Sequence, residues 1–403
     1  MPPPPDSSDP TVLDGLKRLP ARNWVSVGLV LAVTSLNAFN DNILKMMLVG
    51  LAPKVTAGIL ASEIGALLGA MILLPFIIFA PLAGYFADRY SKRAVIMAML
   101  IAQAVILLVT GACFEAAWGS LSIILALGTF FLLAAQSTFF SPGKMGILKE
   151  VTGSRRLGMV CGWLQMVTMI GILCGLGVGG AWFDAIYKET GDAWEAAARP
   201  IWILFGVAMV ALAGGFFIQK TPAHPDVRFH ASLFWEHFLH LRESLTSRGM
   251  RRAFFGNATY WFVASMVAAM FVDIGIALFP DIRAGGAASA SSEMTLMVGL
   301  GTVAGSLFIS VINRRGLQLG IVPLGALGLA GTLIWAGYAP VDSSGFDAAL
   351  AAIGFTGACY MVPIQAYIQD RANPEKRGRV LASMNLLDSL AGIAGVVFLI
   401  LLK

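Results

Sequence analysis

The sequence contains little charge. Only 13% of its 403 residues are Asp, Glu, Lys or Arg, whereas 57% are hydrophobic, and the mean hydropathy is +0.77. An ordinary soluble domain is about 25% charged, so the deficit is about twofold. The remaining polar surface is too small to cover a water-soluble globule of this length. The composition therefore predicts a protein embedded in lipid.

Cysteine and histidine are also scarce. The four cysteines lie inside apolar runs without a CxxC pair, which is typical of small hydrophobic core residues. All four histidines fall between residues 224 and 240, in one connection. This placement argues against a zinc site and against a membrane proton relay built on histidine. We therefore expect neither a metal nor a cofactor.

Signatures of two enzyme classes and of nucleic-acid binding are missing. No GxxxxGK[ST] loop occurs, and no histidine is followed five positions later by Asp, the arrangement that acyltransferases use for their base. Lys and Arg outnumber Asp and Glu by 28 to 23, but they lie in short segments between apolar runs. This pattern is typical of topology signals and of attraction to anionic lipid. We expect neither an enzyme nor a nucleic-acid partner.

Long apolar runs dominate what the sequence does contain. Crossing a membrane takes roughly 20 apolar residues, and eleven runs approach this length: 24–50, 62–86, 94–114, 119–140, 158–183, 200–218, 253–279, 292–312, 318–339, 346–368 and 379–401. They predict an all-α, polytopic membrane protein with eleven spans. Most Lys and Arg fall in the connections on one side, which places the N-terminus and the long central connection in the cytoplasm and Lys403 outside.

The chain divides at its one long connection. We expect a disordered, proline-rich cytoplasmic tail at 1–23, a six-helix bundle at 24–218, a linker at 219–252 and a five-helix bundle at 253–403. Apolar linker residues recur at helical spacing and predict an amphipathic helix on the membrane face. These residues are Phe229, Leu233, Phe234, Phe238, Leu241 and Leu245. The helix is either a strut that holds the bundles in register or a lipid sensor.

The two halves resemble each other. Arg156-Leu-Gly-Met-Val160 at the fifth span is similar to Arg377-Gly-Arg-Val380 at the eleventh, six spans later. Parallel repeats of six helices are typical of major facilitator transporters, whose two bundles they form. On that plan a twelfth helix would follow residue 401. Its absence predicts either a fragment or a partner that covers the exposed groove.

The loop between the second and third spans carries a signature. The segment Gly84-Tyr-Phe-Ala-Asp88-Arg89-Tyr-Ser-Lys92-Arg93 resembles the signature loop of the major facilitator superfamily, with Ser91 in place of that family's second Gly. Gly permits a tight turn, Asp can accept hydrogen bonds from helix N-termini, and the basic residues hold the cytoplasmic side. A plain positive-inside turn is the alternative. The expected gate residues are Gly84, Asp88, Arg89, Lys92 and Arg93.

Three further stretches resemble the bacterial lysophospholipid transporter family. They are Asn37-Ala-Phe-Asn40-Asp41-Asn42, Phe140-Ser-Pro-Gly-Lys144-Met-Gly-Ile-Leu148 and Val362-Pro-Ile-Gln-Ala-Tyr-Ile-Gln-Asp-Arg371 running into Arg377-Gly378. The resemblance covers nearly the whole chain to residue 401. It implies that the protein moves lysophospholipid, chiefly lysophosphatidylethanolamine, from the outer to the inner leaflet of the bacterial inner membrane. The delivered lipid would be re-acylated by an acyltransferase or an acyl-carrier ligase.

Charges within the apolar runs need an explanation, because each costs on the order of 3 kcal/mol. Asp41 and Lys45 are four residues apart and share a helix face, so they can neutralise each other. Alternatively they bind a phosphoethanolamine head group, the carboxylate receiving the ammonium and the Lys the phosphate. Asn40 and Asn42 would add neutral hydrogen bonds.

Two other stretches hold candidate residues. Asp388, in Asn385-Leu-Leu-Asp388, aligns with an acidic position of the family's eleventh helix. Both polar residues are expected to bind substrate, with Asp388 facing the first span, unless Asp388 is a satisfied polar residue at a helix contact. Lys144 follows Ser-Pro-Gly, where we expect a helix to end and backbone amides to be free for an anion. It belongs either to the gate or to the topology signals.

Two other functions fit the same residues. A proton-coupled exporter of drugs or small amphiphiles would use Asp41 or Asp388 as its proton carrier. A non-transporting membrane scaffold or truncated remnant would account for the missing twelfth helix. A neighbouring acyltransferase gene would favour the lipid transporter, and an efflux operon would favour the exporter.

Overall fold

The protein is all-helical across the residues that its computed structural model describes, namely 10–15, 18–56, 64–223, 225–226, 245–279 and 286–402. Eleven helices of that part are long and apolar enough to cross a membrane, as the apolar runs predicted. The linker residues expected to form an amphipathic helix lie outside the described residues, except Leu245. The four histidines lie outside them as well.

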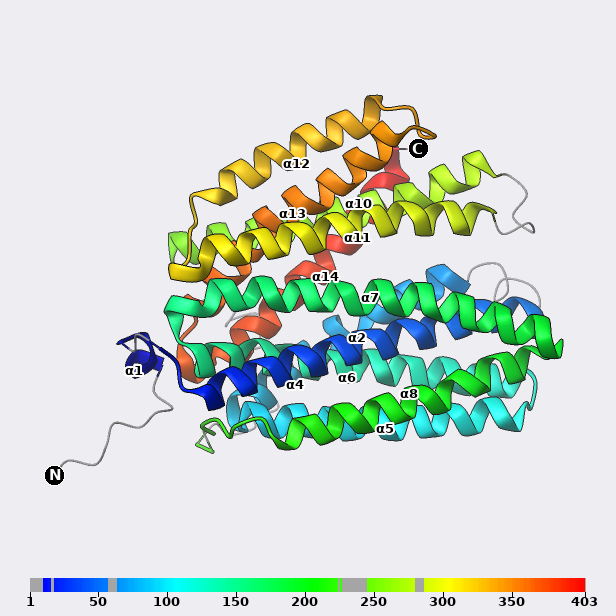
Figure 1. Cartoon of the computed structure of the whole chain (residues 1–403), viewed down its shortest axis with the longest axis horizontal. Coiled ribbons are helices and arrows are strands. Elements are labelled where there is room, and N and C mark those ends of the chain that lie inside the picture. The colour runs from blue at the N-terminus through cyan, green and yellow to red at the C-terminus, as the bar shows by residue number, and fades with distance from the viewer. Residues whose placement is uncertain are drawn as a thin grey trace.

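Six long helices form the first bundle (Figure 1). A short helix, α1 (Pro10–Gly15), precedes them, and the six are α2 (Ala21–Val55), α4 (Ile64–Arg89), α5 (Lys92–Ala116), α6 (Ser120–Thr152), α7 (Ser154–Thr190) and α8 (Ala193–Phe216). Helix α1 replaces part of the disordered tail expected at 1–23. It docks because Leu13 is buried and Asp14 accepts a hydrogen bond from the backbone N–H of Arg155 at 2.8 Å.

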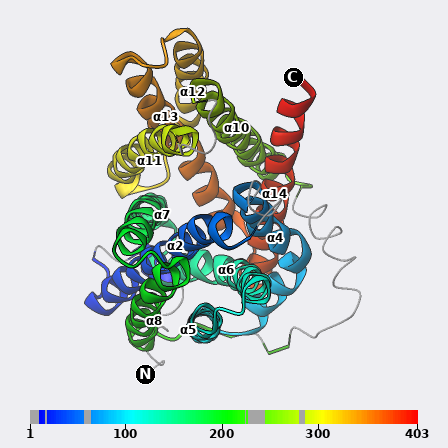
Figure 2. The same cartoon turned by 90° about the vertical axis from the view of Figure 1, so that its right-hand side faces the viewer.

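Five long helices form the second bundle (Figure 2). They are α10 (Arg248–Leu278), α11 (Gly286–Ile312), α12 (Ile321–Tyr338), α13 (Ser344–Arg371) and α14 (Arg377–Leu402), with 3₁₀ turns η2 (Asn313–Arg315) and η3 (Pro374–Lys376) before α12 and α14. Gly325 is the one buried residue of α12 in the described chain. Helix α12 is therefore the more exposed of the two third helices, because its counterpart in the first bundle, α5, packs against both α6 and α8.

One helix continues where the sequence predicted an end. The Ser-Pro-Gly stretch does not terminate α6, which runs through Pro142 to Thr152. Proline removes one backbone donor from a helix, but packing by neighbouring helices makes it tolerable in a membrane protein. Ile147, Leu148 and Val151 beyond the proline are fully buried. Lys144 therefore lies within a continuous helix and not at a terminus with free amides.

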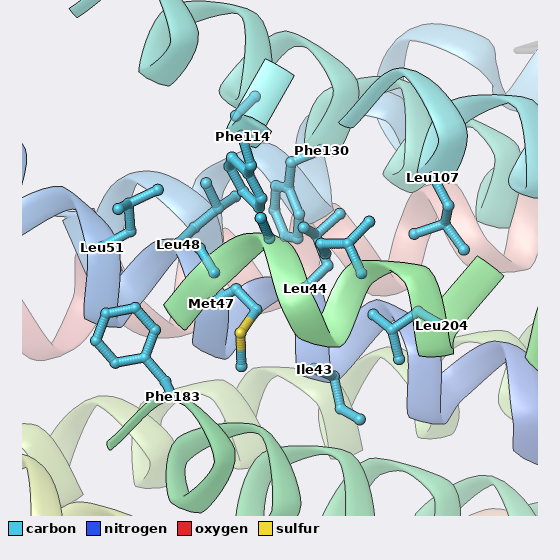
Figure 3. Close-up of a cluster of buried hydrophobic side chains, with 14 of the residues drawn as sticks. Ile43, Leu44, Met47, Leu48, Leu51, Leu107, Phe114, Phe130, Phe183 and Leu204 are labelled. Atoms are coloured by element: carbon cyan, nitrogen blue, oxygen red, sulfur yellow. The ribbon is translucent and has the colours of Figure 1, made fainter. Parts of the chain in front are cut away.

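The first bundle is packed around the C-terminal half of α2. Ile43, Leu44, Met47, Leu48 and Leu51 point from α2 into one apolar cluster (Figure 3). Facing helices complete the cluster with Leu107, Phe114, Phe130, Phe183 and Leu204. Because this part of α2 is fixed from several sides, the polar stretch one turn before it is held in a definite orientation.

Glycines bring α2 and α7 unusually close. A Cβ at Gly175 would lie 2.7 Å from the carbonyl oxygen of Phe39, and one at Gly179 would lie 2.9 Å from Met46 Cβ. Gly171 faces the carbonyl oxygen of Ser35 in the same way. We call Gly171, Gly175 and Gly179 the α7 glycine stripe. Small residues at such spacing let membrane helices approach backbone to backbone.

The two bundles meet along α4–α14 and α7–α11. Figure 1 shows α7 and α11 close together at the left and diverging toward the right. Near the start of α7, Gly158 and Gly162 abut Asn313 of η2 and Ser310 at the end of α11. We call this the basic end, because it carries the connections between α4 and α5, α6 and α7, and α13 and α14, with Lys92, Arg155 and Arg377.

Candidate substrate site and basic-end closure

Asp41 lies within α2 in a polar cluster of the first bundle. One carboxylate oxygen, Oδ2, accepts hydrogen bonds from Ser137 Oγ at 2.8 Å and Asn37 Nδ2 at 3.0 Å. The other, Oδ1, accepts only a long 3.4 Å bond from Gln103 Nε2 among the described residues. A carboxylate has about four lone-pair sites. Oδ1 therefore keeps capacity for a further donor.

Two buried amide side chains extend the hydrogen bonds of this cluster. Gln136 Nε2 donates to Asn37 Oδ1 at 3.2 Å and to the carbonyl oxygen of Met99 at 3.0 Å. Gln136 and Gln103 are both buried. Asn37, Gln103, Gln136 and Ser137 were not among the predicted site residues. Their signal in the sequence was a polar side chain inside an apolar run, which is equally typical of contacts between helices.

Asp41 does not form the expected ion pair with Lys45. No salt bridge within 4.0 Å joins them, and Lys45 has no hydrogen bond or ion pair to any described residue, although it is half-buried. The cation that acts electrostatically on Asp41 is Lys144, whose ammonium also lies 5.5 Å from the centre of the Phe140 ring. The polar cluster thus pairs one carboxylate with the Lys144 cation of α6, and Lys45 follows one turn later on α2.

The asparagines that flank Asp41 point elsewhere. Asn40 is fully buried and donates through Nδ2 to the carbonyl oxygen of Leu204 on α8 at 3.2 Å. Asn42 donates to the carbonyl oxygen of Ala38 on its own helix at 2.8 Å. Because successive residues of a helix are rotated by about a quarter turn, three consecutive polar residues cannot face one cavity. The structure does not bring Asn40 and Asn42 to Asp41.

Asp388 lies in the second bundle and faces α10, not α2. Asn257 Nδ2 lies 2.8 and 2.7 Å from its two carboxylate oxygens, and both residues are buried. Asn385, one turn earlier on α14, instead donates to Ser141 Oγ of α6 at 2.9 Å. Asn385 therefore joins the two bundles, whereas Asp388 stabilises a helix contact within one of them.

Asp88 ties α4 to the start of α14 at the basic end. It accepts hydrogen bonds from the backbone N–H groups of Gly378 and Arg379 and from Arg379 Nε at 3.0 Å. Asp88 is fully buried. A carboxylate is favourable at a helix N-terminus. The helices approach closely, since a Cβ at Gly84 would lie 2.8 Å from Arg379 Cα.

The basic residues of the same loop bind mainly within the first bundle. Arg89 donates to the Tyr85 hydroxyl at 2.8 Å, and Arg93 donates to the carbonyl oxygen of Phe216 at 2.6 Å. Buried Lys92 pairs with Glu150 of α6 at 3.2 Å. Glu150 also lies 3.8 Å from Arg377 at the start of α14, so Glu150 links Lys92 to the second bundle.

A third ion pair across the bundles was missed by sequence reasoning. Lys149 at the end of α6 pairs with Asp370 near the end of α13 and also contacts Ser154. We call the three pairs Asp88–Arg379, Glu150–Arg377 and Lys149–Asp370 the latch. Among the described residues, the ion pairs that join the two bundles all lie at the basic end. The structure is therefore closed at this end.

Weakening the latch is expected to open the basic end. Asp88→Asn keeps the side-chain shape but removes the charge from three hydrogen bonds, and charged bonds are worth about 1.5–3 kcal/mol. The closed-to-open ratio should fall about ten- to a hundredfold. A cysteine at position 382, where Ala382 is buried against α4, would report opening by faster alkylation in a Cys174→Ser background.

A matched control is Arg93→Gln, since Arg93 bonds Phe216 within the first bundle and lies outside the latch. Equal alkylation rates in the Asp88→Asn and Arg93→Gln variants would show that the latch does not hold the bundles together.

Comparisons with known proteins agree with this architecture. A family model described as the Major Facilitator Superfamily matches residues 29–396. The lysophospholipid transporter LplT of Serratia proteamaculans (strain 568) is 23% identical over 376 residues, which cover 90% of this chain and 84% of that protein. LplT of Escherichia coli (strain SE11) is 25% identical over 376 residues, covering 90% and 85%.

Solved structures are similar in fold at low sequence identity. FucP, a major facilitator transporter crystallised in the outward conformation, superposes with a TM-score of 0.71 at 15% identity, covering 94% of this chain and 91% of that chain. The human organic anion transporter MFSD10 (TETRAN) gives 0.70 at 16% identity, covering 94% and 93%. Because the family model spans nearly all eleven helices, this chain belongs to the Major Facilitator Superfamily, and its resemblance to proteins named lysophospholipid transporter is confirmed.

Proposed function

We propose that this chain is a secondary transporter of lysophospholipid, chiefly lysophosphatidylethanolamine. The observation that carries the proposal is the polar cluster around Asp41. It combines a carboxylate that has a spare acceptor site with Lys45 and Lys144 inside apolar helices. Similarity to lysophospholipid transporters over 90% of the chain supports the same substrate class.

The chemistry of the head group suits these charges. A phosphoethanolamine head carries an ammonium and a phosphate a few bonds apart, so it needs an anionic and a cationic partner together. In our proposal Asp41 Oδ1 accepts the ammonium, and Lys45 or Lys144 binds the phosphate. Asn385 assists by holding α6 and α14 together through Ser141. Asp388 is a second polar contact, reached when the bundles move.

We further propose the orientation and the physiological role. The basic end, with the N-terminus, would face the cytoplasm of a bacterial inner membrane, because Lys and Arg gather there. Bundles 24–218 and 253–403 would rock against each other, with the latch and Gly84 as the cytoplasmic gate. Lipid would move from the outer to the inner leaflet, where an acyltransferase or acyl-carrier ligase re-acylates it.

Reconstitution tests this function. Liposomes containing the purified protein should move radiolabelled lysophosphatidylethanolamine from the outer leaflet, measured as label that albumin no longer extracts. Protein-free liposomes and liposomes with diacyl phosphatidylethanolamine are the controls. Movement no faster than in protein-free liposomes would exclude the proposal.

The same liposomes test proton-coupled export as the second candidate. The buried carboxylate of Asp388 favours this candidate, because its described partner is the neutral amide of Asn257 and no cation pairs with it among the described residues. A proton gradient that drives a cationic amphiphile, with no lysolipid movement, would identify an exporter instead.

A further inference from the structure

A cavity of about 140 Å³ lies among the helices of the second bundle. Within this bundle its walls come from α10, α11, α12 and α13, and include Val263, Val267, Phe271, Val298 and Ile353. No charged side chain is among the described residues that line it, and the polar ones are Tyr260 and Thr295. The cavity is therefore a predominantly apolar space inside one bundle.

The cavity reaches the boundary between the bundles beside the part of α2 that leads to Asp41. Met169 of α7, in the first bundle, forms part of its wall, and Gly299 of α11 beside it packs against Leu173. The α7 glycine stripe gives the register, since Gly171 faces Ser35 and Gly175 faces Phe39. The segment from Met169 to Gly175 therefore lies beside the turns of α2 just before Asp41, which include Asn37 of the polar cluster.

The chemistry of the walls selects the class of occupant. An apolar cavity of about 150 Å³ stays dry and accepts a benzene-sized group, which has six carbon atoms. A polar group would lose its hydrogen bonds on entering such a space. The natural occupant of an apolar slot that lies a few helical turns from a charged cluster is the chain of an amphiphile whose polar head binds that cluster.

We propose that this cavity holds a stretch of the acyl chain while the first bundle holds the head group. The inference rests on the proposed function and adds a chain-binding site in the second bundle. Lipid is as apolar as these walls, so leaving the bilayer gives the chain no hydrophobic gain. The cavity would therefore contribute selectivity and not hydrophobic free energy, because its shape determines which acyl chains fit.

Photolabelling tests the location directly. The probe is lysophosphatidylethanolamine with a diazirine near the methyl end of its chain, applied to wild-type protein in liposomes and mapped by peptide mass spectrometry. We expect adducts on Val263, Val267 or Ile353. Adducts confined to lipid-facing residues, such as exposed Leu324 and Leu327 of α12, would overturn the inference.

A variant in which the cavity is filled provides a second test of the chain site. Ala264 lines the cavity, and Ala264→Leu should reduce the cavity adducts about tenfold, because over-packing excludes the chain. Ala326→Leu is the matched control, since Ala326 is exposed on α12; it should leave the adducts unchanged. Equal adduct yields in both variants would contradict the chain site.

Uptake by the wild type separates the two possible failures. If the liposomes take up lysolipid but no adduct forms in the cavity, the chain site alone is wrong. If they take up no lysolipid and the cavity stays unlabelled, the proposed function and the chain site both fail.

Discussion

Replacing Asp41 by Asn is expected to lower lysolipid uptake about ten- to a hundredfold, because a charge-assisted hydrogen bond is worth about 1.5–3 kcal/mol. The amide keeps the shape of the carboxylate and can still bond Ser137 and Asn37. The protein should therefore fold normally. The measurement is uptake of labelled lysophosphatidylethanolamine into proteoliposomes, at matched protein content. Asp184→Asn is the control, because Asp184 is an exposed carboxylate of α7 outside the polar cluster.

A double variant decides whether Asp41 binds substrate or only neutralises a neighbour. The structure makes Lys144 the relevant neighbour, although the sequence had favoured Lys45. If Asp41 only balances Lys144, the single change leaves a buried ammonium uncompensated and stability falls with activity. Asp41→Asn with Lys144→Met would then restore both. If Asp41 binds the substrate ammonium, the double variant folds but does not transport, so restored uptake would refute that role.

Introducing a side chain at Gly354 is expected to prevent stable folding. A Cβ at this position of α13 would overlap the carbonyl oxygen of Val298 on α11. In the same way, a Cβ at Gly301 of α11 would overlap the carbonyl oxygen of Ala351 on α13. Over-packing costs about 1–3 kcal/mol where side chains can adjust. Backbone can yield only if α11 and α13 separate, so Gly354→Leu should cost about 3 kcal/mol or more.

The comparison that isolates packing is Gly354→Ala against Gly177→Ala. A Cβ at Gly177 of α7 meets no atom within 4 Å, so that change should alter stability by about 1 kcal/mol at most. Thermal unfolding in detergent, followed by tryptophan fluorescence, measures both. Indistinguishable melting temperatures would mean that α11 and α13 are less tightly packed than described.

The eleven spans were predictable because lipid imposes a length and a composition on each helix. Asp88 was also predictable in kind, since a carboxylate in a signature loop accepts bonds from a helix N-terminus, although the identity of Gly378 and Arg379 was not. The pairing of Lys149 with Asp370 joins residues 221 positions apart. No local pattern carries such a pair, because it depends on how the two bundles meet.

The separation of Asn40 and Asn42 from the Asp41 cluster has a physical cause. Both residues adjoin Asp41 in the sequence, yet Asn40 bonds α8 and Asn42 bonds its own helix. The true neighbours of Asp41, Ser137 and Gln103, come from α6 and α5. Rotation of each helix about its axis selects these neighbours, and that rotation is set by packing across the whole bundle, such as the α2 cluster with Phe114 and Phe183.

The α7 glycine stripe has a consequence for natural variation among related chains. Gly171, Gly175 and Gly179 set the distance between α7 and α2, the helix that carries Asp41. A descendant that gained a bulky residue at one of the three glycines would lose the alignment of a carboxylate it never contacted. Asp41 and the stripe should therefore be inherited together. Lineages that have replaced a glycine of the stripe should also have replaced Asp41, and the reverse. An alignment of relatives would reveal this linkage without any biochemical assay.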